Sequence, residues 1–338
     1  MIYWFTLWVL RIIFLSYSDI SYRHMAEIIQ KTSNALLSGS TYLLSSLSGN
    51  PVILGMPVTI SFELTNHCNL KCPECTSGSG LMKRERGYMD IGLYKKVIGE
   101  LKPFLYFINL YFQGEPMMHP RFFSFPEFAD GIRTVVSTNG HFLTEENSEK
   151  LVKSGLKKLI VSLDGMTQQV YSQYRQNGEF GKVIAGIRNV AAARDKCHSS
   201  LKLELQFLVN RYNEKQIPEA RRFAKETGAS LKLKSMQVIS DGNIGKWMPA
   251  TGKFRRYKKV NGKYTIRNSM PDRCPRLWFN PVITWDGLVI PCCFDKDAGF
   301  VMGNVNHESF RSIWNNNRYQ EFRKNVFTGT VKHIGGYL

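Results

Sequence analysis

Three cysteines, Cys68, Cys72 and Cys75, occur in the run Cys-Asn-Leu-Lys-Cys-Pro-Glu-Cys, just after the strand-like stretch Val58–Leu64. At this C-x3-C-x2-C spacing, three thiolates can bind three irons of a four-iron cluster and leave the fourth iron open to a small molecule. Structural zinc instead requires four protein ligands, usually in separate C-x2-C pairs. No further Cys or His follows nearby, so the spacing favours the iron–sulfur cluster over zinc and over three metal-free cysteines.

The run resembles the signature of the radical SAM superfamily. The resemblance implies that the open iron binds the amino and carboxylate groups of S-adenosylmethionine (SAM). It also implies reductive cleavage of SAM to methionine and a 5′-deoxyadenosyl radical, which abstracts hydrogen from a substrate. One position departs from the family pattern, because the residue before the third cysteine is often aromatic in the superfamily and is Glu74 here.

The segment Gln113-Gly114-Glu115-Pro116 resembles the Gly-Gly-Glu-Pro motif of the same superfamily, with Gln113 in place of the first glycine. The resemblance implies that Gly114 and Glu115 contact the amino group of the methionyl part of SAM, a donor that an acceptor-rich loop suits. A plain turn is the alternative interpretation of Gly-Glu-Pro taken by itself.

Two later loops and one arginine also resemble superfamily segments that contact SAM. The resemblance implies contacts with the ribose hydroxyls and the methionyl carboxylate from Ser137, Asn139, Ser162, Asp164 and Arg175. Short polar side chains suit a diol, and a guanidinium fork suits a carboxylate. The alternatives are simple Asn-Gly and Asp-Gly turns for the loops and an exposed helix position for the arginine.

A second group of cysteines, Cys274, Cys292 and Cys293, lies near the carboxyl end of the sequence. Asp286-Gly287 stands between two β-like runs and predicts a hairpin. The spacing of these residues resembles the opening of a SPASM domain, which implies an auxiliary iron–sulfur cluster bound by the three cysteines.

The resemblance to a SPASM domain is incomplete. Family members generally carry a further C-x2-C pair, whereas no cysteine follows Cys293 in this sequence. We therefore expect a truncated or divergent tail, in which His307 or Asp295 are conceivable substitute ligands of an auxiliary cluster.

From residue 57 to about residue 238, short β-branched or aromatic runs alternate with longer helical patterns, which is typical of parallel strands joined by helices. The alternation fits the partial, six-stranded (β/α)6 TIM-like barrel that the family resemblance implies, although periodicity alone leaves a doubly wound sheet open. In such barrels functional residues lie in the loops after the strands, where the cysteine triad is found. The expected strands are Val58–Leu64, Leu105–Phe112, Arg133–Ser137, Lys158–Leu163, Leu203–Val209 and Leu231–Val238. The expected helices are Ile91–Leu101, Glu145–Lys153, Gln168–Tyr174, Lys182–Arg194 and Glu214–Thr227.

We expect three regions in this α/β chain. Residues 1–50 form an apolar and helical segment, residues 51–239 form the barrel, and residues 240–338 contain a linker and the cysteine-containing extension. The linker is expected over Ser240–Arg273, which is rich in Gly, Lys, Arg and Asn and has little hydrophobic periodicity.

The first fifteen residues are almost entirely apolar and aromatic, apart from Arg11. This stretch is short for a membrane-spanning helix and lacks the features of a secretory signal. Two interpretations stay open: Met25 is the true start and residues 1–24 are not native, or residues 1–15 contact a membrane surface.

The sequence is strongly basic, since 45 Lys and Arg against 27 Asp and Glu give a net charge of +18. This charge indicates an acidic partner, yet it is spread along the chain without a nucleic-acid-binding motif, so a nucleic acid is disfavoured. Clustered cysteines indicate metal ligands in a reducing compartment, which predicts a cytoplasmic protein.

These observations together predict a radical SAM enzyme that uses a 4Fe-4S cluster, SAM and a reducing electron-donor protein. The expected substrate is a peptide or protein side chain, because similar proteins mostly act on such groups. The alternatives are a dehydrogenase of a small molecule such as an aminosugar, a metal- or nucleic-acid-binding protein without turnover, and an inactive fragment.

Overall fold

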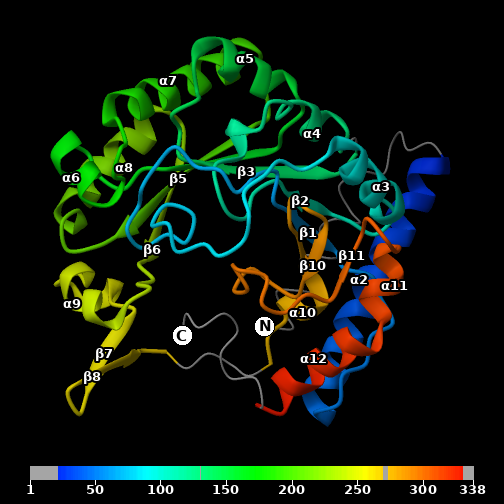
Figure 1. Ribbon diagram of the computed structural model, residues 1–338. Helices are drawn as coiled ribbons and strands as arrows, with labels where there is room; N and C mark the ends of the chain where they lie inside the picture. The colour runs from blue at the N-terminus through cyan, green and yellow to red at the C-terminus, as the bar shows by residue number, and fades with distance from the viewer. Residues whose placement is uncertain (1–21, 130, 269–272, 330–338) are drawn as a thin grey trace.

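The computed structural model describes residues 22–129, 131–268 and 273–329. Nine strands form one open sheet, with helices on its outer, convex side (Figure 1). The strands of this sheet are β1 (Thr59–Phe62), β2 (Phe107–Asn109), β3 (Arg133–Thr138), β4 (Lys158–Ser162), β5 (Lys202–Val209), β6 (Ser230–Ser235), β9 (Val282–Ile283), β10 (Leu288–Ile290) and β11 (Gly303–Asn304).

The strands β1 to β6 lie side by side in chain order and are all parallel. The two edge strands of the sheet, β6 and β11, do not pair with each other, so the sheet is curved but not closed. The six expected strands are therefore confirmed as a partial barrel, and the doubly wound alternative is not observed. Strands β1 and β2 are shorter than the apolar runs that predicted them, because those runs continue into loops.

The crossover helices begin where side-chain oxygens can accept hydrogen bonds from their first free N–H groups. Asp90, Thr144 and Thr167 cap helices α3, α5 and α6 in this way. These three helices have the bounds that the sequence predicted. The helices of the barrel region are α3 (Ile91–Leu101), α4 (Ser124–Glu127), α5 (Glu145–Lys153), α6 (Gln168–Tyr174), α7 (Phe180–Lys196) and α8 (Ile217–Glu226), with short 3-10 turns at η1 (Pro116–Met118) and η2 (Glu214–Gln216).

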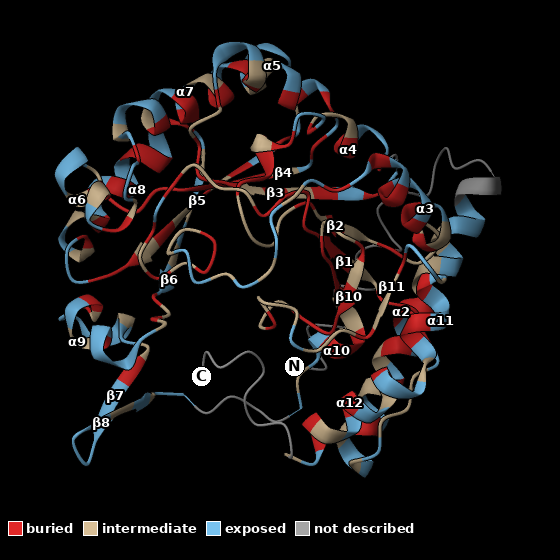
Figure 2. Ribbon diagram, in the orientation of Figure 1, coloured by how far each residue is buried: buried red, intermediate tan, exposed pale blue. Residues whose placement is uncertain are grey.

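The two faces of the sheet have different surroundings. Side chains alternate between the faces of a strand, so every second residue packs under the helices. On β5, Phe207 and Val209 are fully buried against Ile217 and Ala220 of α8. Figure 2 shows this pattern as buried strands lined by helices whose outer faces are exposed. The alternate residues of each strand face the concave side of the sheet.

The predicted linker contains more regular structure than its composition indicated. A hairpin of β7 (Tyr257–Val260) and β8 (Lys263–Ile266) turns at Asn261 and Gly262, which both have positive φ. Asn-Gly between two alternating runs is a signal for this type of turn, and the composition of the surrounding segment obscured it. The segment also contains η3 (Asp241–Asn243), α9 (Ile244–Trp247) and η4 (Gly252–Phe254).

The cysteine-containing extension continues the sheet of the barrel. Strand β9 pairs with β1 in parallel, and β10 returns antiparallel to β9 through the predicted turn at Asp286 and Gly287. Three helices complete the unit, namely α10 (Arg276–Phe279), α11 (Phe310–Asn315) and α12 (Asn317–Phe327). The division at residue 239 stays a prediction, and the sheet extends across it.

Helix α2 (Tyr22–Ser48) lies beside the extension (Figure 1). One face of this helix is buried through small residues such as Ala35 and Ser38, whereas Ile29, Leu36 and Leu47 are exposed. None of the helices in the described part of the chain combines the length and apolar character that a membrane crossing requires. Residues 1–21 lie outside the described residues, and with them the predictions for residues 1–15.

Candidate metal and cofactor site

The three cysteines of the triad lie on one loop at the carboxyl end of β1. The amide of Cys75 donates to the carbonyl of Cys72 at 3.2 Å, which turns the loop back on itself. The thiols are close enough to influence one another, and the loop packs on a hydrophobic cluster with Tyr174 and Trp247. Burial raises the pKa of Cys68 to about 12 and that of Cys72 to about 11. Metal binding at these thiols would therefore have to release protons.

The arrangement of the triad suits an iron–sulfur cluster, because three thiolates on one loop can each bind a different iron. In the described ranges, no three Cys, His, Asp or Glu side chains converge closely enough to bind one metal ion. In a four-iron cluster each thiolate binds a different iron, so the sulfurs need to share a loop but not one coordination sphere. The assignment of Cys68, Cys72 and Cys75 as cluster ligands remains a prediction that this geometry supports.

Arg175 lies directly beside the triad. Its Nε donates to Asp164 Oδ2 at 2.6 Å, and its Nη1 lies 3.8 Å from Cys72 Sγ. The Asp164 carboxylate is fully buried, and its Oδ1 also accepts the amide of Leu208 at 2.7 Å. Asp164 therefore orients the guanidinium, and Arg175 places a positive charge at the sulfur of Cys72. The guanidinium is not the exposed surface group that the alternative interpretation supposed.

Gly114 and Glu115 hold the loop after β2 against the triad loop. The amide of Glu115 donates to the carbonyl of His67 at 2.7 Å. At Gly114 the φ is +73°, and an added Cβ would lie 2.5 Å from the carbonyl oxygen of Thr65, so only glycine fits without a shift. Glu115 is buried and accepts hydrogen bonds from Thr138 Oγ1 at 2.7 Å and the amide of Asn139 at 2.6 Å.

The other predicted SAM contacts lie at the carboxyl ends of β3 and β4, with Ser137 and Ser162 on the strands and Asn139 and Asp164 in the loops that follow. Ser137 and Ser162 face the concave side of the sheet, as do the residues beside them in register on the neighbouring strands. Neither hydroxyl has a hydrogen-bond partner within the described residues, so both are available to a ligand. Asn139 donates from Nδ2 to Asn69 of the triad loop at 2.7 Å, while its Oδ1 accepts from His141. Contact of these residues with SAM stays a prediction.

Burial raises the pKa of Glu115 to about 7, although hydrogen bonds from Asn139, Thr138 and Met117 and the charge of Arg175 oppose the rise. The pKa of Glu115 in the folded protein is above its ordinary value of 4.5. Between pH 4.5 and pH 7 the native state therefore binds more protons at Glu115 than the unfolded state does. This group should therefore lower the free energy of unfolding by about 3 kcal/mol as pH rises from 4.5 to 7. Urea unfolding at a series of pH values should show this slope in the wild type but not in Glu115→Gln, and parallel pH curves for the two proteins would contradict the assignment.

Glu74 has a role that the sequence did not predict. Its carboxylate is buried and accepts hydrogen bonds from the Ile239 amide at 2.7 Å, Asn243 Nδ2 at 2.9 Å and Trp247 Nε1 at 3.0 Å. It thereby joins the triad loop to the segment after β6, more than 160 residues away in the chain. The departure from an aromatic residue at this position is explained by these three donors. No local sequence signal could have identified them.

Replacing Glu74 by glutamine should lower the free energy of unfolding by roughly 2 kcal/mol, because the amide cannot accept all three hydrogen bonds and turns an N–H group toward a donor. Urea unfolding of the cluster-free protein under reducing conditions would measure the change. Glu127→Gln is the matched control, because Glu127 is exposed on α4. Equal stability of Glu74→Gln and wild type would contradict the role of these hydrogen bonds.

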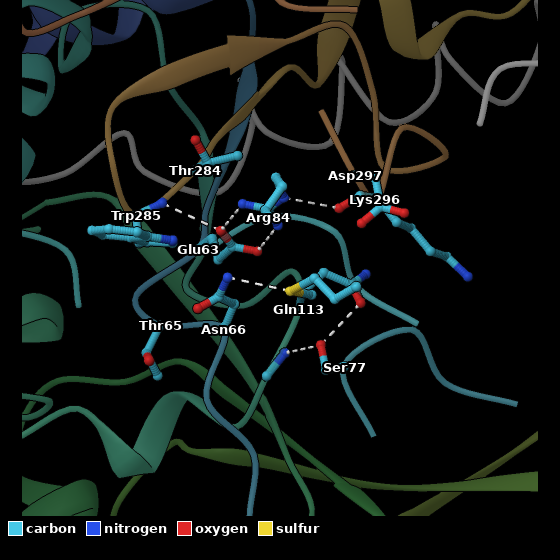
Figure 3. A network of polar contacts seen from close by, with 12 residues as sticks. Glu63, Thr65, Asn66, Ser77, Arg84, Gln113, Thr284, Trp285, Lys296 and Asp297 are labelled. Carbon is cyan, nitrogen blue, oxygen red and sulfur yellow. Dashed lines mark hydrogen bonds and ion pairs between the residues drawn. The ribbon is translucent and has the colours of Figure 1, made fainter. Parts of the chain in front are cut away.

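Arg84 and Glu63, the residue directly after β1, form a buried ion pair that is linked to the extension (Figure 3). Arg84 donates from both terminal nitrogens to Glu63, at 2.8 and 2.6 Å, and the side chains are only 8% and 0% exposed. Arg84 Nε also donates to the carbonyl of Lys296, and the Trp285 amide donates to Glu63. Arg84 is therefore a structural link between the chain that follows the triad loop and the extension.

The cysteines of the extension lie near one another, and their binding of an auxiliary cluster stays a prediction. Cys274, Cys292 and Cys293 influence one another, and burial raises the pKa of Cys292 to about 12. Asp295 is buried, and its carboxylate accepts the amides of Gly299 and Phe300, so it already serves the turn.

The second conceivable substitute ligand, His307, is exposed on the turn after β11. Ligation of an auxiliary cluster by Cys274, Cys292 and Cys293 stays a prediction.

Comparison with known proteins assigns this architecture. The model of the radical SAM superfamily matches residues 62–224, and that of the SPASM domain, an iron–sulfur cluster-binding domain, matches residues 274–332. Among solved structures, SuiB of Streptococcus suis bound to the precursor peptide SuiA is similar over 93% of this chain and 76% of its own, with a TM-score of 0.64 and 14% identity. At this identity the likeness shows the fold.

Two curated relatives illustrate the range of similar proteins. Mycofactocin maturase MftC of Mycobacterium tuberculosis is 30% identical over 192 residues, which are 56% of this chain and 47% of the relative. The SAM-dependent 2-deoxy-scyllo-inosamine dehydrogenase of Niallia circulans is 25% identical over 80% of this chain and 87% of its own. The chain thus spans about half the length of the maturase that it matches.

Proposed function

Because this chain belongs to the radical SAM superfamily and carries a SPASM domain, we propose that it is an enzyme that cleaves SAM reductively and oxidises a substrate by hydrogen abstraction. The single observation that carries the proposal is the convergence of three thiols and one guanidinium at the carboxyl ends of the parallel strands. A cluster bound there would supply the electron that cleaves SAM to a 5′-deoxyadenosyl radical.

The residues of the chain have separate tasks in this proposal. Cys68, Cys72 and Cys75 would bind the cluster, and Arg175 would lower the energy of negative charge on it through the contact with Cys72. Ser137 and Ser162, whose hydroxyls have no protein partner in the described ranges, would donate to and accept from the polar groups of SAM.

Gly114 supports this site by allowing the loop after β2 to approach the triad loop without a side chain between them. Glu115 and Asp164 are buried with their oxygens occupied by protein donors, so we assign them to positioning these loops and Arg175. Direct contact of either carboxylate with SAM remains a second, separate proposal.

We propose a peptide or protein side chain as the substrate, in keeping with the maturase relative, and a reducing protein as the electron donor. The curved sheet leaves β6 as an unpaired edge, which leaves the concave side open to an extended chain. The second candidate substrate is a small molecule, because the inosamine dehydrogenase matches over 87% of its length. We also propose a cytoplasmic location and an auxiliary cluster on Cys274, Cys292 and Cys293.

The test is anaerobic reconstitution with iron and sulfide. We expect about four irons per triad and a change in the cluster spectrum when SAM is added. We also expect formation of 5′-deoxyadenosine that depends on dithionite. A cluster whose spectrum is unaffected by SAM would overturn the proposed function.

A further inference from the structure

The concave face of the sheet carries several lysines on neighbouring strands. Parallel register places Lys232 beside Gln206 and Lys234 beside Leu208, so each pair faces the same side. Leu208 packs against the hydrophobic cluster around the triad. The lysines of β6 therefore face the space that the cysteine triad borders.

Other cations reach the same space from β4 and from the extension. Partial burial lowers the pKa of Lys234 most, Glu204 opposes this effect, and the nearby charges of Lys232, Arg276 and Lys158 lower the pKa further. Arg276 comes from α10 and contacts the sulfur of Cys293. The space is thus bordered by four cations from three different parts of the chain: Lys158, Lys232, Lys234 and Arg276.

Two of these cations already have partners, since Lys158 is paired with Glu204 and Arg276 contacts the sulfur of Cys293, whereas Lys232 and Lys234 have none in the described protein. Glu204 raises the pKa of Lys234, yet its carboxylate is already paired with Lys158, whose Nζ lies 2.7 Å from Oε2. Lys232 and Lys234 are exposed, and no hydrogen bond or ion pair of their ammonium groups is found among the described residues. Like charges held together without a counter-charge repel, so an anion bound between them would be stabilised.

We propose that Lys158, Lys232, Lys234 and Arg276 bind an anionic group of the substrate, a carboxylate or a phosphate, on the concave face of the barrel. The inference rests on the proposed function, because it takes this face as the substrate site.

The test is titration of the reconstituted holoprotein, saturated with SAM, with two probes in a calorimeter at low salt. The probes are pyrophosphate, for a phosphorylated small molecule, and hexaglutamate, for an acidic peptide. The double variant Lys232→Glu/Lys234→Glu should bind the preferred probe about tenfold more weakly, since two attractive charges become repulsive. The probe whose binding weakens in the double variant shows whether the anionic group belongs to a phosphorylated small molecule or to an acidic peptide.

The control is Lys225→Glu on the outer helix α8, where Lys225 is exposed. It should bind the probe as the wild type does, whereas an equal loss in this variant would attribute binding to bulk charge and overturn the proposal. Unchanged affinity in the double variant would also overturn it. If the double variant does not fold, Lys232→Gln/Lys234→Gln serves, with a smaller expected loss.

Failure of this inference is distinct from failure of the proposed function. Formation of 5′-deoxyadenosine together with unchanged probe binding in the double variant overturns the anion site alone. The opposite result is also distinguishable. If the double variant loses probe binding but the cluster of the protein does not respond to SAM, the anion site is supported and the proposed function is overturned.

Discussion

Replacing Cys72 by alanine is expected to reduce the dithionite-dependent formation of 5′-deoxyadenosine to the background rate. Cys72 is buried at the centre of the triad loop, and its sulfur lies 3.8 Å from Arg175 Nη1. Without this thiolate, two ligands remain for the cluster, and both the bound iron and the site of SAM cleavage should be lost. Iron content, the cluster spectrum and 5′-deoxyadenosine would be measured together under anaerobic conditions.

Cys197→Ala is the matched control for this experiment. Cys197 is an exposed thiol at the carboxyl end of α7 and is not near either cysteine group in sequence. Its removal should leave iron content and product formation unchanged. Substantial product from Cys72→Ala, or an equal loss in Cys197→Ala, would show that the triad is not the site of cleavage.

Replacing Glu63 by alanine is expected to lower the free energy of unfolding by about 3–5 kcal/mol. The change leaves the guanidinium of Arg84, only 8% exposed, without its counter-charge. It also removes the acceptor of the Trp285 amide in the extension. Urea unfolding of the cluster-free protein would measure the loss.

Two controls separate the buried charge from the mere loss of an ion pair. Glu146→Ala removes the partner of Lys150 in an exposed pair on α5 and should not change stability measurably. The double variant Glu63→Leu/Arg84→Met should recover most of the loss, because it removes both charges together. A double variant as unstable as Glu63→Ala would mean that packing, rather than the unpaired charge, sets the stability.

The barrel was predictable because its signals are local. Helices α3, α5 and α6 have the predicted bounds, since each begins at a capping side chain next to an apolar stripe. The hairpin at Asp286 and Gly287 also follows from a short turn sequence. The hairpin of β7 and β8 was missed although Asn261-Gly262 is a similar signal, because a segment rich in polar residues was interpreted by its composition.

The partners of charged residues were not predictable, because they come from distant parts of the chain. Glu74 accepts from Trp247, and Arg84 donates to Glu63 and to the carbonyl of Lys296. Sequence periodicity fixes which face a residue occupies, but not which distant loop covers that face. The carboxylates of Glu63 and Glu74 are buried and link distant parts of the chain.

By itself, the sequence determined the order of strands and helices, the two groups of cysteines and the resemblance to a superfamily, since each is encoded within a few neighbouring residues. Only the tertiary structure decided that β9 pairs with β1, that Asp164 orients Arg175 at Cys72, and that Lys232 and Lys234 lie on the same side of the sheet as Leu208. The physical reason is burial: a charge inside a protein must find a counter-charge or a donor, and the folded chain alone determines which ones lie within reach.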